Sequence, residues 1–194
     1  MSTLKNSARE IQVSRLIGVL FLCAAVTPTG TPAAEHAVCH EAGNFRIVVK
    51  ATVSVGHDFI VKKIRPDQVT SPCNFHIEPE DMEIRNENAE HFLALEGSLL
   101  ILDSGTAPGP RGLILWDIEK GIKVYSGSYS GPYRIERNGM YFWLHSGDAT
   151  DANCAQAVRW REQGLGAAIE TEVWLGFADY RLVQGTAKRC VARQ

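Results

Sequence analysis

Serine hydroxyls and cysteine thiols are the side chains of this sequence that could serve as nucleophiles. A serine hydrolase of the α/β class carries Gly-x-Ser-x-Gly on a strand-to-helix turn. Residues 127–131 read Gly-Ser-Tyr-Ser-Gly, which puts Tyr129 where the nucleophile would stand. A cysteine nucleophile needs a reduced thiolate, and the cysteines here are explained more simply as structural. We therefore predict a protein that is not an enzyme. Catalytic carboxylate pairs cannot be recognised at long sequence separation, so an acid–base hydrolase stays an open alternative.

Histidines offer a second kind of chemistry, metal binding, near the N-terminal end of the predicted domain. A chain that began at Ala34 would bring a free amine, two amide nitrogens and the imidazole of His36 together. Cu(II) and Ni(II) favour such a planar nitrogen set. Motifs this short match by chance at a high rate. We predict no metal site and no cofactor, and leave copper or nickel binding at this terminus open.

The stretch from Val124 to Cys154 combines several short motifs. It contains Ser-Gly-Ser-Tyr at 126–129, Ser-Gly-Pro-Tyr at 130–133, Asn-Gly-Met-Tyr-Phe-Trp at 138–143 and Gly-Asp-Ala-Thr at 147–150. This stretch resembles the periplasmic or membrane-bound inhibitors of c-type lysozyme, small β-barrel proteins with a Ser-Gly-x-Tyr loop, a Phe-Trp strand and a Lys-Gly-Asp segment. The similarity covers about 30 residues. It departs from the family where His145-Ser146 stands in place of the lysine.

The resemblance implies a protein that binds in the active-site cleft of a muramidase and blocks access of the substrate. Such an enzyme cleaves its polymer with a pair of carboxylates, and an exposed loop could place a hydroxyl and a donor side chain against that pair. The residues that the resemblance assigns to partner binding are Ser126, Tyr129, Ser130, Tyr133, His145 and Asp148. The main alternative is a periplasmic or secreted structural or ligand-binding module that uses the same fold for an unknown partner.

The N-terminus predicts export. Lys5, Arg9 and Arg15 precede the apolar run Leu16 to Val26, and small residues follow up to Ala34. This is the order of a signal peptide. The run has 11 residues, whereas a membrane-spanning helix needs roughly 20. We therefore expect residues 1–34 to be cleaved, residues 35–194 to form a single domain in the periplasm or outside the cell, and no membrane span.

Four cysteines remain after such a cleavage, an even number in an oxidising compartment. They are Cys39, Cys73, Cys154 and Cys190. Two disulfides are expected. We favour Cys39–Cys73 with Cys154–Cys190 because each closes a moderate loop around evident strands, and Cys39–Cys190, which would join the two ends of the domain, is the rival pairing.

The charge of the predicted domain restricts its partners. Cleavage removes three of the 20 basic residues and Glu10 of the 22 acidic residues, which leaves 17 against 21 and a net charge near −4. Nucleic acid is excluded as a partner because phosphate binding needs a basic face. A basic protein such as a c-type lysozyme would be attracted to this domain.

The periodicity of the chain is mostly two, which is typical of strands. Alternation is clearest at 47–55, and Asn138-Gly139 is the sharpest hairpin signal. Further strands are predicted at 59–64, 91–95, 99–103, 113–118, 123–126, 140–144, 158–160, 169–175 and 180–183. Many short strands separated by turns predict an all-β protein. We expect either an antiparallel β-sandwich or a small β-barrel, cross-linked by two disulfides.

Overall fold

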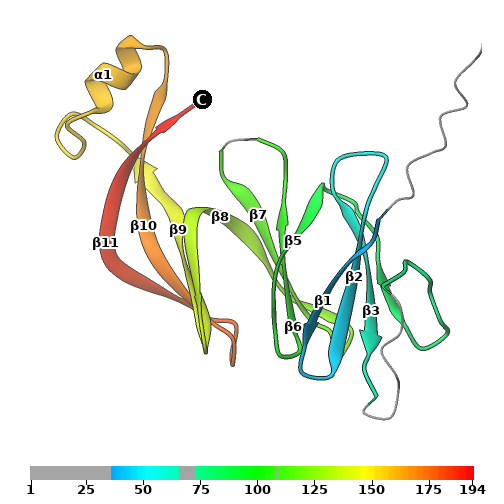
Figure 1. The fold of residues 1–194 in the computed structure, drawn as a ribbon. Coiled ribbons are helices and arrows are strands. Elements are labelled where there is room, and N and C mark those ends of the chain that lie inside the picture. Colours follow the sequence, from blue (N-terminus) through cyan, green and yellow to red (C-terminus); the bar gives the residue numbers. More distant parts are fainter. Residues whose placement is uncertain (1–35, 66–72, 108) are drawn as a thin grey trace, which may run out of the picture. The chain divides into compact units, whose positions relative to one another are not determined.

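The computed structural model describes residues 36–65, 73–107 and 109–194, which fall within one compact unit, Ala34–Gln194. The predicted signal peptide lies outside the described residues. Within the described residues the fold consists of two antiparallel sheets and one short helix (Figure 1). Two disulfides cross-link it. The prediction of an all-β, disulfide-bonded fold is therefore confirmed.

The N-terminal sheet has four strands in the order β1-β2-β3-β4. Their bounds are β1 Val38–Ala42, β2 Phe45–Ala51, β3 His57–Lys63 and β4 Met82–Ile84. The predicted strand 47–55 ends early, because a turn begins after Ala51 and leaves Val53 and Val55 exposed. Arg46, a charged residue just before the predicted strand, is buried and pairs with Glu41 at 2.6 Å.

The C-terminal sheet has seven strands in the order β11-β10-β9-β8-β7-β6-β5. Their bounds are β5 Glu90–Glu96, β6 Leu99–Ser104, β7 Arg111–Asp117, β8 Ile122–Glu136, β9 Gly139–Asp148, β10 Gly166–Gly176 and β11 Leu182–Arg193. Strand β8 joins the two halves of this sheet, as Figure 1 shows: its first half pairs with β7 and its second half with β9.

Apolar side chains from both sheets form one core. Ile47 and Phe59 of the N-terminal sheet pack with Leu100 and Leu102 of β6, so the two sheets face each other as in a sandwich. A second core lies on the C-terminal sheet around Leu113, Met140, Phe142 and Leu175. These cores account for the period-two pattern, since alternate side chains of a strand point to the same face.

The predicted hairpin at Asn138-Gly139 is present between β8 and β9. Glu136 pairs with Gly139, so Arg137 and Asn138 form a two-residue turn one position earlier than expected. Gly139 is also required by packing, because a Cβ at this position would lie 2.3 Å from Cζ2 of Trp174 and 2.5 Å from the Leu175 carbonyl oxygen. The close approach of β10 therefore selects glycine here.

The predicted strand at 158–160 is wrong. These residues belong to α1, Ala157–Glu162. Ala157 is fully buried and Trp160 packs beside it, which is a helical spacing of three rather than a strand spacing of two. No helix in the described part of the chain is long and apolar enough to span a membrane.

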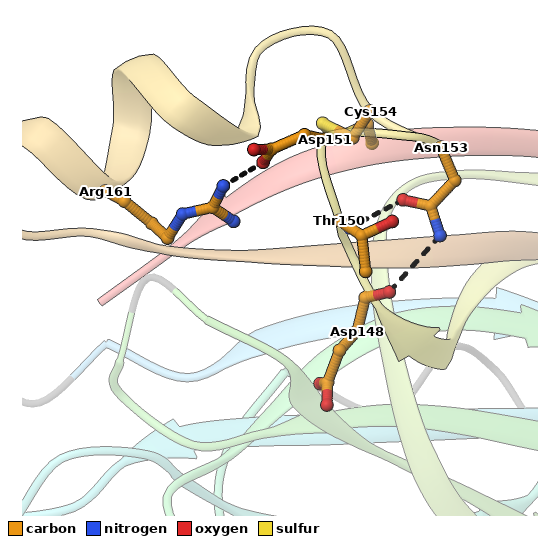
Figure 2. The surroundings of a disulfide bond; sticks show 7 residues. Asp148, Thr150, Asp151, Asn153, Cys154 and Arg161 are labelled. Atoms are coloured by element: carbon orange, nitrogen blue, oxygen red, sulfur yellow. Dashed lines mark hydrogen bonds and ion pairs between the residues drawn. A yellow bond between two sulfur atoms is a disulfide. The ribbon is translucent and has the colours of Figure 1, made fainter.

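Both disulfides follow the favoured pairing, Cys39–Cys73 and Cys154–Cys190. The second joins the connection after β9 to the edge strand β11. Figure 2 shows how this connection is held: the Asn153 side chain accepts from the Thr150 amide at 2.7 Å and donates to the Asp148 carbonyl at 3.4 Å. Arg161 of α1 pairs with Asp151.

Candidate functional site

The segment from Ser126 to Tyr133, predicted as an exposed loop, is part of strand β8. Ser126 and Tyr129 lie in register with Ile114 and Arg111 of β7. The prediction of a loop is wrong for residues 126–130, because ladder pairing with two neighbouring strands outweighs the weak strand preference of serine and glycine. Ser126 is exposed on this strand, away from any loop tip.

Tyr129 belongs to the core rather than to an exposed surface. Its side chain is 4% exposed, and its ring centroid lies 6.2 Å from that of Phe142 in an edge-on arrangement. Burial raises the pKa of the Tyr129 hydroxyl, and the neighbouring Asp103 carboxylate adds to the rise. Asp103 is held in turn by two bonds of 2.6 Å from Arg111. Tyr129 is therefore not available to a partner.

Gly131, Pro132 and Tyr133 form a bulge that leaves the β8–β9 register. Ser130 pairs with Trp143 and Arg134 pairs with Tyr141. Between these pairs β8 has three residues where β9 has one, so the extra residues are left outside the ladder. All three are exposed, and the Tyr133 side chain is 40% exposed. We call residues 131–133 the β8 bulge.

Beside the bulge, one face of the C-terminal sheet carries aromatic rings covered by guanidinium groups. Arg134 lies over the Tyr141 ring at 3.7 Å, and Arg189 lies over the Trp143 ring at 4.4 Å. The centroids of Tyr141 and Trp174 are 4.6 Å apart. These five residues, Arg134, Tyr141, Trp143, Trp174 and Arg189, are called the aromatic face below. None of its three aromatic rings belongs to the three core clusters.

Glu170 anchors one end of the aromatic face. Its carboxylate is 2% exposed and accepts from Arg189, with Nε at 2.8 Å and Nη2 at 2.6 Å, and from Arg193 at 2.7 Å. A buried charge is tolerated only when it is paired and hydrogen-bonded. Arg189 also donates to the carbonyl of Gly131, which ties the β8 bulge to β11.

A cleft of about 640 Å³ opens at this end of the sheet. Its polar lining consists of Ser130, Glu170, Arg189 and Arg193 from β8, β10 and β11, together with Gln194. Its apolar lining includes Pro110, Leu165 and Val191. The cleft therefore combines paired charges with hydrocarbon surface, as ligand sites commonly do.

The two remaining predicted residues, His145 and Asp148, lie near the end of β9. His145 is exposed and pairs in register with Glu170. Asp148 is exposed and pairs with Ala168, and Figure 2 shows its carboxylate pointing away from Asn153. The fold thus brings Ser130 and His145 toward Glu170 through adjacent strands and places Ser126 in the other half of the sheet.

Among the described residues, no group of three or more His, Cys, Asp or Glu side chains is placed to hold a metal ion. The copper or nickel set that the sequence left open at the N-terminus depends on Ala34 and Glu35, which lie outside the described residues.

Sequence reasoning missed Trp174 and the pair Glu170–Arg189. Alternation in the predicted strand 169–175 contained a usable signal, because Glu170, Glu172 and Trp174 fall on one face. A tryptophan on a face otherwise made of charges indicates a surface that is not simply solvated. The partners of Glu170 lie 19 and 23 residues further along the chain, which no local pattern could show.

Comparisons with protein-family models, with curated proteins and with solved structures found no match to this chain.

Proposed function

We propose that this chain is an exported, non-catalytic binding protein that holds a protein partner on the aromatic face and the β8 bulge. The observation that carries the proposal is that Arg189 stacks on Trp143 while it donates to the Gly131 carbonyl of the β8 bulge and to the Glu170 carboxylate. The sequence resemblance supplies the first partner to test, a c-type lysozyme.

The composition of the aromatic face supports this proposal. Tyrosine, tryptophan and arginine are enriched in protein interfaces and dominate their binding energy, because they bury large areas with little loss of rotamer freedom. Ala157 and Trp160 of helix α1 pack against Ile169 and the Cys154–Cys190 disulfide. Ile169 is adjacent to Glu170 in the chain, so it points to the opposite face of the sheet. The aromatic face is therefore left for a partner.

The internal bonds of the aromatic face also favour binding. Arg189 is fixed by Glu170, the Trp143 ring and the Gly131 carbonyl at once. Arg134 is fixed by Glu172 at 2.8 Å and by the Tyr141 ring. Side chains that are already ordered lose less entropy when a partner binds, which raises affinity without further contacts.

The contacts expected with lysozyme differ from those inferred from sequence. Tyr129 belongs to the core, so the exposed Tyr133 of the β8 bulge takes the role of the inserted aromatic residue. Ser130, which lines the cleft, supplies the hydroxyl. The net charge near −4 expected for the exported domain would attract a basic enzyme, so binding should weaken as salt is added.

The test is lysis of bacterial cell walls by a c-type lysozyme in the presence of the purified protein. We expect inhibition at micromolar concentration, and Tyr133→Ser should weaken it about tenfold or more. Ile122→Ser, at the other end of β8, removes an apolar side chain of comparable exposure and should change nothing. A wild-type protein without effect at micromolar concentration excludes lysozyme as the partner.

The alternative function is a ligand-binding module of the cell envelope. One observation favours it, the cleft beside the β8 bulge, whose charged and apolar lining could hold a small molecule. Equilibrium dialysis against an extract of the periplasm, followed by mass spectrometry of the retained compounds, would detect such a ligand.

A further inference from the structure

We propose that the cleft beside the β8 bulge binds the carboxylate group of a small organic acid with an apolar body. The carboxylate would lie against the guanidinium groups of Arg189 and Arg193 and the hydroxyl of Ser130, which line this cleft together. This proposal does not depend on the identity of the protein partner.

The two guanidinium groups retain hydrogen-bond donors for a ligand. The Glu170 carboxylate accepts hydrogen bonds from Nε and Nη2 of Arg189 and from Nη2 of Arg193. Within the described part of the chain, Nη1 of Arg189 and Nε and Nη1 of Arg193 have no protein acceptor, and the side chains are 27% and 21% exposed. A guanidinium whose remaining N–H groups form a fork matches the two oxygens of a carboxylate.

The charge of the cleft favours a ligand with a single negative charge. Among the side chains that line the cleft, Arg189 and Arg193 carry two positive charges, and the buried carboxylate of Glu170 cancels one of them. The remaining positive charge is neutralised by a monoanion. A phosphate dianion would leave excess negative charge close to Glu170, where partial burial strengthens the repulsion.

The rest of the lining fits a hydrocarbon body rather than a second charged group. Ala107, Pro110, Leu165 and Val191 also line the cleft. A volume of about 640 Å³ is within the range of small-molecule sites, roughly 300–1,000 Å³. The polar end would therefore orient the ligand, while burial of its apolar body would contribute affinity.

The experiment measures binding of hexanoate by isothermal titration calorimetry at low ionic strength, with hexanamide as the uncharged isostere and inorganic phosphate as the dianion. We expect hexanoate to bind with a Kd below about 1 mM, and the other two probes to bind at least about tenfold more weakly. Absence of hexanoate binding at about ten times that concentration, or equal binding of hexanamide, overturns the proposal.

Two variants locate the site. Arg193→Gln removes free donors of the cleft and should weaken hexanoate binding about tenfold. Arg134→Gln removes a guanidinium of the same sheet that pairs with Glu172 and does not line the cleft, so it should leave binding unchanged. Equal effects of the two variants would contradict the assignment.

Loss of Arg193 also removes a partner of buried Glu170, so a second variant tests the site should Arg193→Gln fail to fold. Ser130→Asp places a carboxylate beside the guanidinium groups from a strand position that is only half-buried. This carboxylate would occupy the ligand position and repel hexanoate, with an expected loss of at least about tenfold. Hexanoate affinity that is unchanged in folded Ser130→Asp refutes the proposal. Tyr133→Ser should bind hexanoate normally, which separates this site from partner binding by the β8 bulge.

Discussion

Arg189 lies with its guanidinium over the Trp143 ring, 4.4 Å from the centroid, and donates from Nε to the buried carboxylate of Glu170 at 2.8 Å. This side chain links a half-buried aromatic ring to a carboxylate that has almost no access to water. The aromatic face and the cleft therefore share one support, and changes to Glu170 should affect both.

Glu170→Gln should lower the free energy of unfolding by about 3–5 kcal/mol, because it leaves two guanidinium groups without their buried anion. Urea denaturation followed by circular dichroism measures this change. Glu172→Gln is the matched control on the same strand. Glu172 pairs with the exposed Arg134, so its loss should cost about 1 kcal/mol or less. Equal losses in both variants would show that Glu170 is not a buried anchor.

The two tyrosines of the Ser-Gly-x-Tyr units should respond differently to truncation. Tyr129→Ser empties a core position and should lower the free energy of unfolding by about 3 kcal/mol. Tyr133→Ser removes a side chain that is 40% exposed and should leave stability within about 0.5 kcal/mol. Thermal denaturation of the two variants compares them directly, and similar midpoints would contradict the burial of Tyr129.

Gly139→Ala should destabilise the protein by about 1–3 kcal/mol, because the new Cβ would overlap the Trp174 ring and the Leu175 carbonyl oxygen. Gly131→Ala is the control, since a Cβ at that position would meet no atom within 4 Å. Chemical denaturation gives the two stabilities. The near-ultraviolet circular dichroism of Gly139→Ala should also change as Trp174 moves, and an unchanged spectrum with unchanged stability would count against this packing.

Acidification should destabilise the protein in the range below about pH 6.5. Burial lowers the pKa of His57, the nearby His91 lowers it further, and the backbone of Glu90 opposes them. Burial also lowers the pKa of His40, which stacks on Phe92. The unfolded chain therefore takes up protons at a higher pH than the folded chain, so stability is lost as pH falls from the unfolded value toward the folded one.

Denaturation midpoints measured between pH 7.5 and pH 5 test this expectation. His57→Gln should flatten the dependence of stability on pH, whereas His76→Gln, which replaces an exposed histidine, should leave it unchanged. A variant at His57 with the wild-type pH dependence would show that this group does not contribute.

The amino-acid sequence by itself determined the all-β class, most of the strands and both disulfides. Alternating apolar residues specify strands because one face of each strand must be buried. The loops closed by Cys39–Cys73 and Cys154–Cys190 are short enough to be favoured over a bridge between the two ends of the domain. The hairpin between β8 and β9 was predicted by local turn chemistry alone, although its turn lies at 137–138 rather than 138–139.

Only the tertiary structure decided the secondary structure of residues 126–133 and of residues 158–160. Serine and glycine have weak strand preference, yet β7 and β9 supply the ladder partners of residues 126–130, and the β8 bulge at 131–133 lies outside this ladder. A segment of three residues, 158–160, is too short for its apolar pattern to distinguish a strand from a single helical turn. The helix forms because it buries Ala157 beside Trp160.

The candidate site was likewise decided by tertiary structure. Ser130, Glu170 and Arg193 are separated by 40 and 23 positions in the chain, and the order β11-β10-β9-β8 brings them to one cleft. Charge pairing across strands depends on register, and register is set by the burial of a whole face rather than by the charged residues themselves. For this reason the sequence shows the members of the site, whereas their arrangement follows from the packing of the sheet.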